Sequence, residues 1–151
     1  MENHVDLKNA RRPDQRSVME QIIKDGKCPF CEENLRMYHT QKIHTENEFW
    51  ILTDNQYPYT GTKVHLLAIS KIHAEALSEL PVGTGEALLD LMKWAEHEFC
   101  SSGGAFAMRF GKTEFSGATV KHLHAQFILP SVEHLNRGNN ITFYIGTPKK
   151  Q

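Results

Sequence analysis

The sequence lacks the features that would place a protein in a membrane or on nucleic acid. No apolar run in its 151 residues approaches the ~20 residues that a membrane-spanning helix needs. Charge of one sign is not in excess, because 17 basic residues face 18 acidic ones. Such a balance lacks the excess of positive charge that is typical of proteins that bind a nucleic acid polymer or an anionic membrane. The polar N-terminus has no signal-peptide core, so we expect a cytoplasmic protein.

Cysteine is scarce as well: there are three, of which Cys28 and Cys31 form a Cys-x-x-Cys pair. In a reducing compartment this spacing indicates a metal site or a redox pair before a disulfide. A redox pair of the thioredoxin type usually opens a helix after a buried strand, and neither element is predicted here. A tetrahedral zinc would need two further ligands. Three histidines near strand ends have no assigned role: His65, His73 and His122. Composition alone does not decide whether the cysteine pair binds a metal.

The hydrophobic pattern predicts one domain that contains both helices and strands. Residues 1–13 are polar, so we expect a flexible N-terminus followed by a single domain over 14–151. Helical spacing of apolar residues predicts a short helix over 14–24, ended by Gly26, and a long helix from 84 to about 100. The expected strands are 42–45, 48–53, 65–69, 105–110, 121–129 and 141–145, and 28–35 is expected to form a knuckle-like turn. The pattern predicts an antiparallel α+β domain.

One predicted strand carries polar side chains at alternate positions: His122, His124 and Gln126. Alternate residues of a strand point to the same face, so we expect the three side chains to project together, about 6.5–7 Å apart. On a buried face each unpaired polar group would cost about 1–3 kcal/mol. The pattern therefore favours a functional site over an exposed hairpin face with incidental histidines.

A glycine-bearing turn precedes this strand, over residues 110–119. Its glycines permit close approach of the backbone, and Ser116, Thr119 and nearby amide groups are suited to hold an anionic oxygen. Most such loops are only turns. Beside two histidines, however, this turn indicates half of a phosphoryl-transfer site, because histidine is a nucleophile at phosphorus and such donors stabilise charge on phosphate oxygens.

These motifs together resemble the histidine triad superfamily, whose signature is His-φ-His-φ-His-φ-φ, where φ is apolar. The sequence has His122-Leu-His-Ala-Gln-Phe-Ile128, so that glutamine replaces the third histidine. That replacement matches the transferase branch, which includes galactose-1-phosphate uridylyltransferase and the diadenosine tetraphosphate phosphorylases. The turn over 116–119 is similar to the phosphate-contacting turn of that branch. Residues 50–54 and 65–73 resemble the family's strand–loop–strand with its terminal Lys-x-His.

The resemblance covers residues 28 to 130 and implies a fold. The histidine triad fold has an antiparallel sheet of about five strands, one long helix and a shorter N-terminal helix. It also implies a homodimer with the 84–100 helix, which carries Trp94 and Phe99, and the strand before it near the interface. A structural zinc is implied, with four protein ligands: Cys28, Cys31, His73 and His122.

Roles in catalysis are implied for other residues. His124 corresponds to the nucleophile, and Gln126 would bind a phosphate oxygen. Because an amide cannot titrate, glutamine favours leaving groups such as phosphate that depart without a proton. Substrate contacts are implied at four positions: Asp54 for ribose, Arg109 where the family usually has asparagine, Ser116 and Thr119.

The implied reaction is ping-pong nucleotidyl transfer. His124 would attack the α-phosphorus of a nucleotide, and an acceptor such as phosphate or a sugar phosphate would resolve the nucleotidyl-histidine. Two alternatives remain. One is a dinucleoside polyphosphate hydrolase, in which water resolves the intermediate, and the other is a nucleotide-binding protein without turnover.

Overall fold

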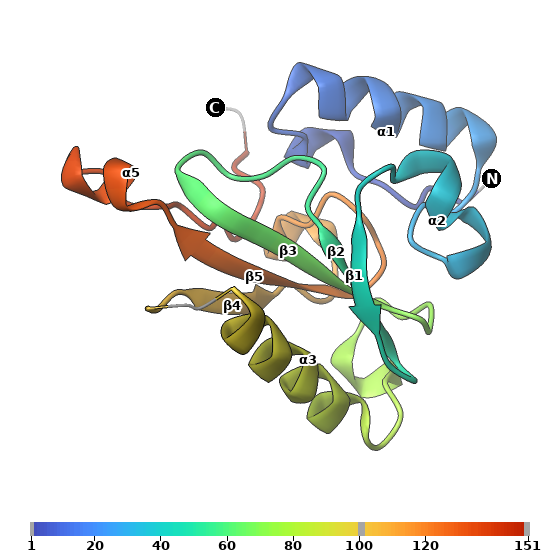
Figure 1. Ribbon diagram of the computed structural model, residues 1–151. Helices are drawn as coiled ribbons and strands as arrows, with labels where there is room; N and C mark the ends of the chain where they lie inside the picture. The colour runs from blue at the N-terminus through green and yellow to red at the C-terminus, as the bar shows by residue number, and fades with distance from the viewer. Residues whose placement is uncertain (1, 100–101, 150–151) are drawn as a thin grey trace.

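A five-stranded antiparallel sheet forms the centre of the computed structural model, which describes residues 2–99 and 102–149 (Figure 1). The strand order is β1-β2-β3-β5-β4, so β5 lies between β3 and the edge strand β4. Helix α3 covers one face of the sheet, whereas α1 and α2 lie on the other (Figure 1). The strands are β1 Ile43–Glu46, β2 Trp50–Asp54, β3 Thr62–Ser70, β4 Ala105–Met108 and β5 His124–Pro130.

The helices are α1 Pro13–Asp25, α2 Glu32–Tyr38, α3 Thr84–Glu98, α4 Thr113–Ser116 and α5 Val132–Asn136. Two short 3₁₀ helices complete the elements, η1 Leu7–Asn9 and η2 Leu77–Glu79. None of the helices formed by the described residues has the length and apolar character to cross a bilayer. These helices and the five-stranded antiparallel sheet together form the predicted α+β fold.

The two main helices follow the predicted pattern closely. Helix α1 begins with Pro13, which has no N–H group and so leaves none unpaired in the first turn. Gly26 follows its last residue with a φ of 64°, a conformation that suits a residue without Cβ. Helix α3 buries one stripe against the sheet, where Leu88, Leu91 and Ala95 pack on β2, β3 and β5. It ends at Glu98, and Cys100, the predicted end, lies outside the described residues.

Three local expectations were wrong. The segment 28–35 turns at Pro29 and Phe30 as expected, but its second half is the start of α2, because Leu35 packs on the apolar face formed by Ile51 and Ile69. Residues 141–145 do not form a strand, and the Tyr144 carbonyl accepts from the Arg109 side chain. Strand β5 begins only at His124, because residues 120–123 bond elsewhere: Val120 bridges Val5, and the Leu123 N–H donates to the Ala74 carbonyl. His122 therefore does not share the strand face of His124.

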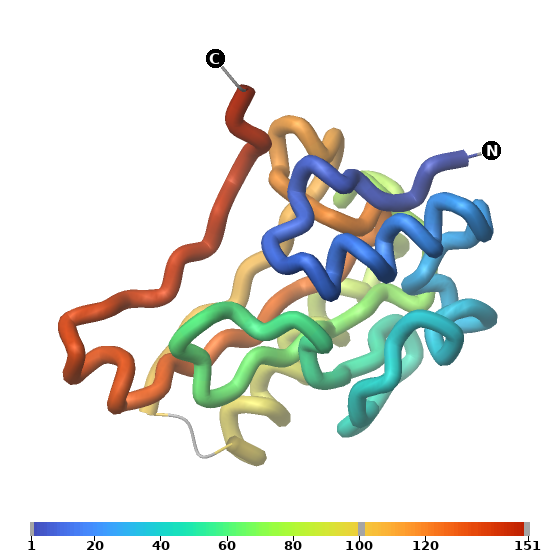
Figure 2. The backbone as a smooth tube through the Cα atoms, turned by 90° about the horizontal axis from the view of Figure 1, so that it is seen from above, coloured from blue at the N-terminus to red at the C-terminus, as the bar shows by residue number. Residues whose placement is uncertain are grey.

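The two ends of the chain meet above the same face of the sheet. Figure 2 shows the C-terminal segment running along one side of the molecule toward α4. There Thr147 donates through Oγ1 to Asn9 and through its backbone N–H to Glu114. Val5 is fully buried near Val120, while flexibility of residues 1–13 stays a prediction. These end segments supply walls for the site.

Candidate active site and metal centre

Strand β5 divides its side chains between the core and a functional face. Ala125, Phe127 and Leu129 pack toward α3, so His124 and Gln126 point to the opposite face. On the neighbouring strand β3 the partners of these two residues are Ile69 and Leu67. The predicted pairing of a histidine with a glutamine on one strand face is therefore present.

His124 is buried, and its tautomer follows from its hydrogen bond. Its Nδ1 lies 2.8 Å from the carbonyl oxygen of His122. A carbonyl only accepts, so Nδ1 carries the proton and Nε2 keeps a lone pair. Burial, helped by the positive charge of Arg109, lowers the pKa of His124 to about 4. At neutral pH the ring is therefore a neutral imidazole, which is the nucleophilic form.

Gln126 is oriented by His65, which comes from β3. His65 Nδ1 accepts from the Tyr59 backbone N–H at 3.0 Å, so Nε2 carries the proton and donates to Gln126 Oε1 at 2.7 Å. The amide oxygen of Gln126 is thereby engaged, which leaves its NH₂ group for another acceptor. Burial lowers the pKa of His65 to about 4. Sequence reasoning considered His65 only as a spare metal ligand and missed this contact.

A cavity of about 980 Å³ lies over this face of the sheet. Its walls come from η1 and the start of α1, from the loop between β2 and β3, and from the C-terminal segment. Four predicted site residues line it: His124, Gln126, Arg109 and Thr119. The cavity therefore brings the predicted nucleophile together with the glutamine and two of the expected substrate contacts.

Two other predicted substrate contacts lie away from the cavity. Asp54 points to the α3 side of the sheet, as Leu52 does, and its Oδ1 lies 2.8 Å from His44 Nε2. The Ser116 side chain is buried, and its Oγ accepts from the Ala118 N–H at 3.2 Å. Neither residue is part of the cavity wall. Sequence motifs singled out both residues but could not give the direction of their side chains.

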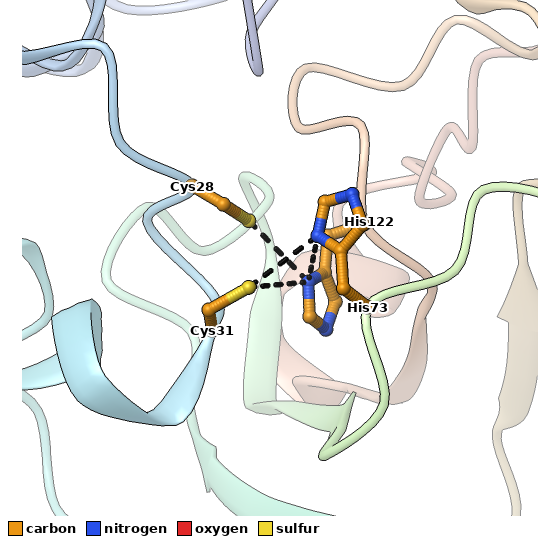
Figure 3. A group of neighbouring side chains, drawn as sticks. All are labelled: Cys28, Cys31, His73 and His122. Atoms are coloured by element: carbon orange, nitrogen blue, oxygen red, sulfur yellow. Dashed lines mark hydrogen bonds between the residues drawn. The ribbon is translucent and has the colours of Figure 1, made fainter.

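Four residues from three distant segments converge at one end of β5 (Figure 3). The ligand atoms of Cys28, Cys31, His73 and His122 all lie within 4.8 Å of one another. The shorter distances are 3.4 Å from Cys28 Sγ to His122 Nδ1, 3.4 Å from Cys31 Sγ to His73 Nδ1, and 3.2 Å between the two Nδ1 atoms. A tetrahedral zinc with its usual bond lengths separates its ligand atoms by roughly 3.3–3.8 Å. The cluster therefore fits a metal ion of that kind.

Proton positions also suit metal binding. His122 Nε2 lies 2.6 Å from the Ser70 carbonyl, so Nε2 is the protonated nitrogen and Nδ1 turns its lone pair to the cysteines. Burial is the main cause that lowers the pKa of His122 to about 4, which keeps the ring neutral. Burial and the neighbouring Cys28 raise the pKa of Cys31 to about 12. Binding of a cation would reverse this effect, because a metal-bound thiol loses its proton.

Comparison with known proteins identifies the fold. No protein-family model matches the sequence, and no curated protein does. Solved structures do match. A HIT family hydrolase from Clostridium thermocellum is 23% identical, with a TM-score of 0.53, over 71% of this chain and 92% of that one. A zinc-bound histidine triad family protein from Mycobacterium smegmatis is also 23% identical, with a TM-score of 0.53. The match covers 70% of this chain and 75% of that one. A hypothetical protein from Leishmania major has a TM-score of 0.60 at 18% identity, and the match covers 83% of this chain and 84% of that one. The chain thus has the fold of histidine triad proteins.

Proposed function

We propose that this chain is a histidine triad protein that transfers a nucleotidyl group through a covalent intermediate on His124. The observation that carries the proposal is the state of His124, a buried neutral imidazole that donates from Nδ1 to the His122 carbonyl and lines a large cavity. Its Nε2 lone pair can attack the α-phosphorus of a nucleotide. The shared fold supports the same assignment.

Two neighbouring groups support the proposed reaction. As Nε2 bonds to phosphorus, positive charge develops on the ring, and the hydrogen bond from Nδ1–H to the His122 carbonyl stabilises it. The NH₂ group of Gln126 is free to donate to a phosphate oxygen, because His65 holds the amide oxygen. Phosphate or a sugar phosphate then accepts the nucleotidyl group from His124.

We also propose that the Cys28, Cys31, His73 and His122 cluster holds a structural zinc. The donor set and the ligand distances support this identity. A bound zinc would supply a rigid anchor, because four protein ligands leave no open coordination position. His122 also provides the carbonyl that orients His124, so anchoring His122 fixes the nucleophile.

The experiment that tests the function is trapping of the intermediate. The protein is incubated with a nucleoside triphosphate labelled at the α-phosphorus, and the labelled protein is isolated. Discharge of the label by phosphate or a sugar phosphate is the result expected for a transferase. A protein that never takes up label under these conditions would be a nucleotide-binding protein at most, and the proposal would be wrong.

A hydrolase is the second candidate, because one of the similar solved structures is named a hydrolase. In that reaction water resolves the same nucleotidyl-histidine. The labelled protein distinguishes the two, since a hydrolase discharges its label in buffer at the rate seen with phosphate.

A further inference from the structure

The hydrogen bond that orients His124 fixes one atom of its ring. Nδ1 donates to the His122 carbonyl at 2.8 Å. The χ2 torsion of histidine is broad, so a single hydrogen bond still lets the ring tilt about the bonded atom. Attack on phosphorus requires the nucleophilic nitrogen to be held within roughly 10–20° of the reacting angle. A second contact is therefore needed to fix the plane of the imidazole.

Phe30 makes such a contact. Its ring stands nearly perpendicular to the His124 imidazole, with the two centroids 5.0 Å apart and the planes at 82°. The same ring lies 6.1 Å from the His122 imidazole, at 85°. Both are edge-to-face arrangements, in which aromatic rings attract each other at centroid distances of about 4.5–7 Å. Phe30 thus lies against the proposed nucleophile and against the histidine whose carbonyl orients it.

The turn that carries Phe30 is held at both of its ends. Phe30 stands between Cys28 and Cys31, whose sulfur atoms both point toward the two histidines of the cluster (Figure 3). Asn34 closes the turn, because its Nδ2 donates to the Cys28 carbonyl at 3.0 Å and its backbone N–H to the Cys31 carbonyl at 2.9 Å. A metal ion in the cluster would add two bonds to the same turn. The backbone on either side of Phe30 is therefore restrained.

The Phe30 side chain is also supported by the sheet. It packs against the apolar cluster that includes Ile69, and Ile69 is the cross-strand partner of His124. The ring is half-buried and lines the cavity. A ring that is restrained by its turn and by packing can in turn restrain the imidazole beside it.

We propose that Phe30 is a positioning residue, whose ring fixes the plane of the His124 imidazole so that Nε2 faces the α-phosphorus of a bound nucleotide. This inference rests on the proposed function. In this role Phe30 forms no bond to the substrate and changes no charge. It acts on the rate of attack, because a nucleophile that is already held at the reacting angle needs less reorganisation to reach the transition state. The contact therefore predicts an effect on the maximal rate of labelling and not on nucleotide affinity.

Phe30→Leu tests this role, because leucine keeps an apolar side chain in the turn and removes the ring. With an α-labelled nucleoside triphosphate, the maximal rate of labelling should fall about tenfold, while the half-saturating concentration stays within about twofold of wild type. Phe30→Tyr keeps the ring and should restore most of the rate. Phe49→Leu is the matched control and should label as wild type does. Phe49 is also half-buried, but it packs on the α3 side of the sheet and is absent from the cavity wall.

NMR spectroscopy tests the contact without turnover. An aromatic ring shifts the resonances of protons that lie against it, so the ring-proton resonances of His124 should move in Phe30→Leu and stay in place in Phe49→Leu. Metal content and melting temperature are measured on each variant. We expect both to match the wild-type values, which would separate loss of the ring contact from loss of the cluster.

Three results would overturn the role of Phe30. They are labelling of Phe30→Leu at the wild-type rate, His124 ring-proton resonances that stay in place, and a raised half-saturating concentration at an unchanged maximal rate. The last of these would make Phe30 a substrate contact. In each case wild-type protein still takes up label, so the proposed function stands. Wild-type protein that takes up no label would instead refute the function, and the role of Phe30 with it.

Discussion

The position of one proton determines what His124 can do. Its Nδ1–H is committed to the His122 carbonyl, so Nε2 is the nitrogen available for bond formation. A carbonyl cannot remove that proton, which means that the ring becomes positively charged when Nε2 attacks phosphorus. Charge on the ring makes the nucleotidyl-histidine reactive toward the next acceptor. In the proposed ping-pong reaction this hydrogen bond would serve both halves.

Replacing His124 should abolish turnover without unfolding the protein. We expect His124→Ala to lower nucleotidyl transfer by at least about 10³-fold, because the covalent route is lost while the binding groups remain. The measurement is label transfer from an α-labelled nucleotide, with the melting temperature as a check of folding. Near-wild-type turnover in a folded variant would show that another residue is the nucleophile.

Restoring a histidine at position 126 should shift the reaction toward water. In Gln126→His a titratable group would lie beside the intermediate, where it can accept a proton from water. We expect a lower ratio of phosphate-dependent to phosphate-independent turnover than in wild type. Gln126→Asn is the control, since it keeps an amide that cannot titrate, and it should not lower this ratio. A ratio that stays at the wild-type value in Gln126→His contradicts this account of the glutamine.

Burial of neutral His65 should make the protein less stable in acid. Its pKa is about 6.5 in the unfolded chain and about 4 in the folded one, mainly because of burial. Between these values the unfolded chain binds more protons, so the free energy of unfolding falls as the pH falls through that window. The full effect is about 3 kcal/mol, and it is complete below pH ~4.

Denaturant unfolding between pH 7 and 4 measures this effect. His65→Gln keeps a donor toward Gln126 but does not titrate, so it should lose less stability across the window than wild type. His97→Gln, which changes an exposed histidine of α3, should follow the wild-type curve. Identical curves for wild type and His65→Gln would mean that His65 is not the group responsible.

The metal cluster ties the start of α2 to the ends of two strands that pair with each other, β3 and β5. Cys31 directly precedes α2, His73 follows β3, and His122 precedes β5. If zinc binds there, chelator-washed protein should keep nearly one zinc per chain by elemental analysis. We expect Cys31→Ser to lose the metal and to unfold or aggregate, because metal-binding energy is part of the folding energy.

A matched substitution of another cysteine shows whether this loss is specific. Cys100→Ser replaces the third cysteine of the sequence and should keep both zinc and the wild-type melting temperature. Wild-type protein that contains no zinc and melts at the same temperature with and without chelator would rule out a structural metal.

Elements with a strong local pattern could be predicted from sequence. Helix α3 has a continuous apolar stripe, and α1 has proline at its start and glycine at its end. Helix α2 has only Leu35 as a buried residue, so its seven residues give too weak a period to be recognised. Residues 141–145 have the composition of a strand but form none, and the Tyr144 carbonyl accepts from the distant Arg109, a contact that no local pattern reveals.

For the site, motifs located residues along the chain, whereas contacts required the structure. The Cys-x-x-Cys pair, the Lys-x-His and the histidine motif gave all four cluster residues once a family resemblance was used. Asp54 matched a motif, yet the alternation of β2 turns its side chain to the α3 side.

A homodimer remains a proposal for the whole molecule. Trp94 and Phe99, which suggested an interface, pack partly against the core and beside His44. Two other apolar residues on that side of the sheet are exposed, Leu89 on α3 and Phe106 on the edge strand β4. We expect light scattering to give a dimer at micromolar concentration, and Phe106→Lys to shift the mass toward the monomer.

A charged residue elsewhere should have no such effect. Phe115→Lys changes a more exposed phenylalanine on α4, away from α3 and β4, and should leave the dimer intact. A monomeric mass for the wild-type protein would refute the homodimer.

The distance along the chain between the cluster residues bears on how the protein folds. Cys28 and His122 are 94 residues apart, and closing a loop of that length costs about 4 kcal/mol of chain entropy. The two cysteines, by contrast, are local and can capture a metal in the unfolded chain. A zinc ion would therefore be held first by the cysteine pair, and His73 and His122 would complete its ligands only when the sheet forms. If zinc binds at this cluster, the refolding rate would therefore depend on whether zinc is present when the chain begins to fold.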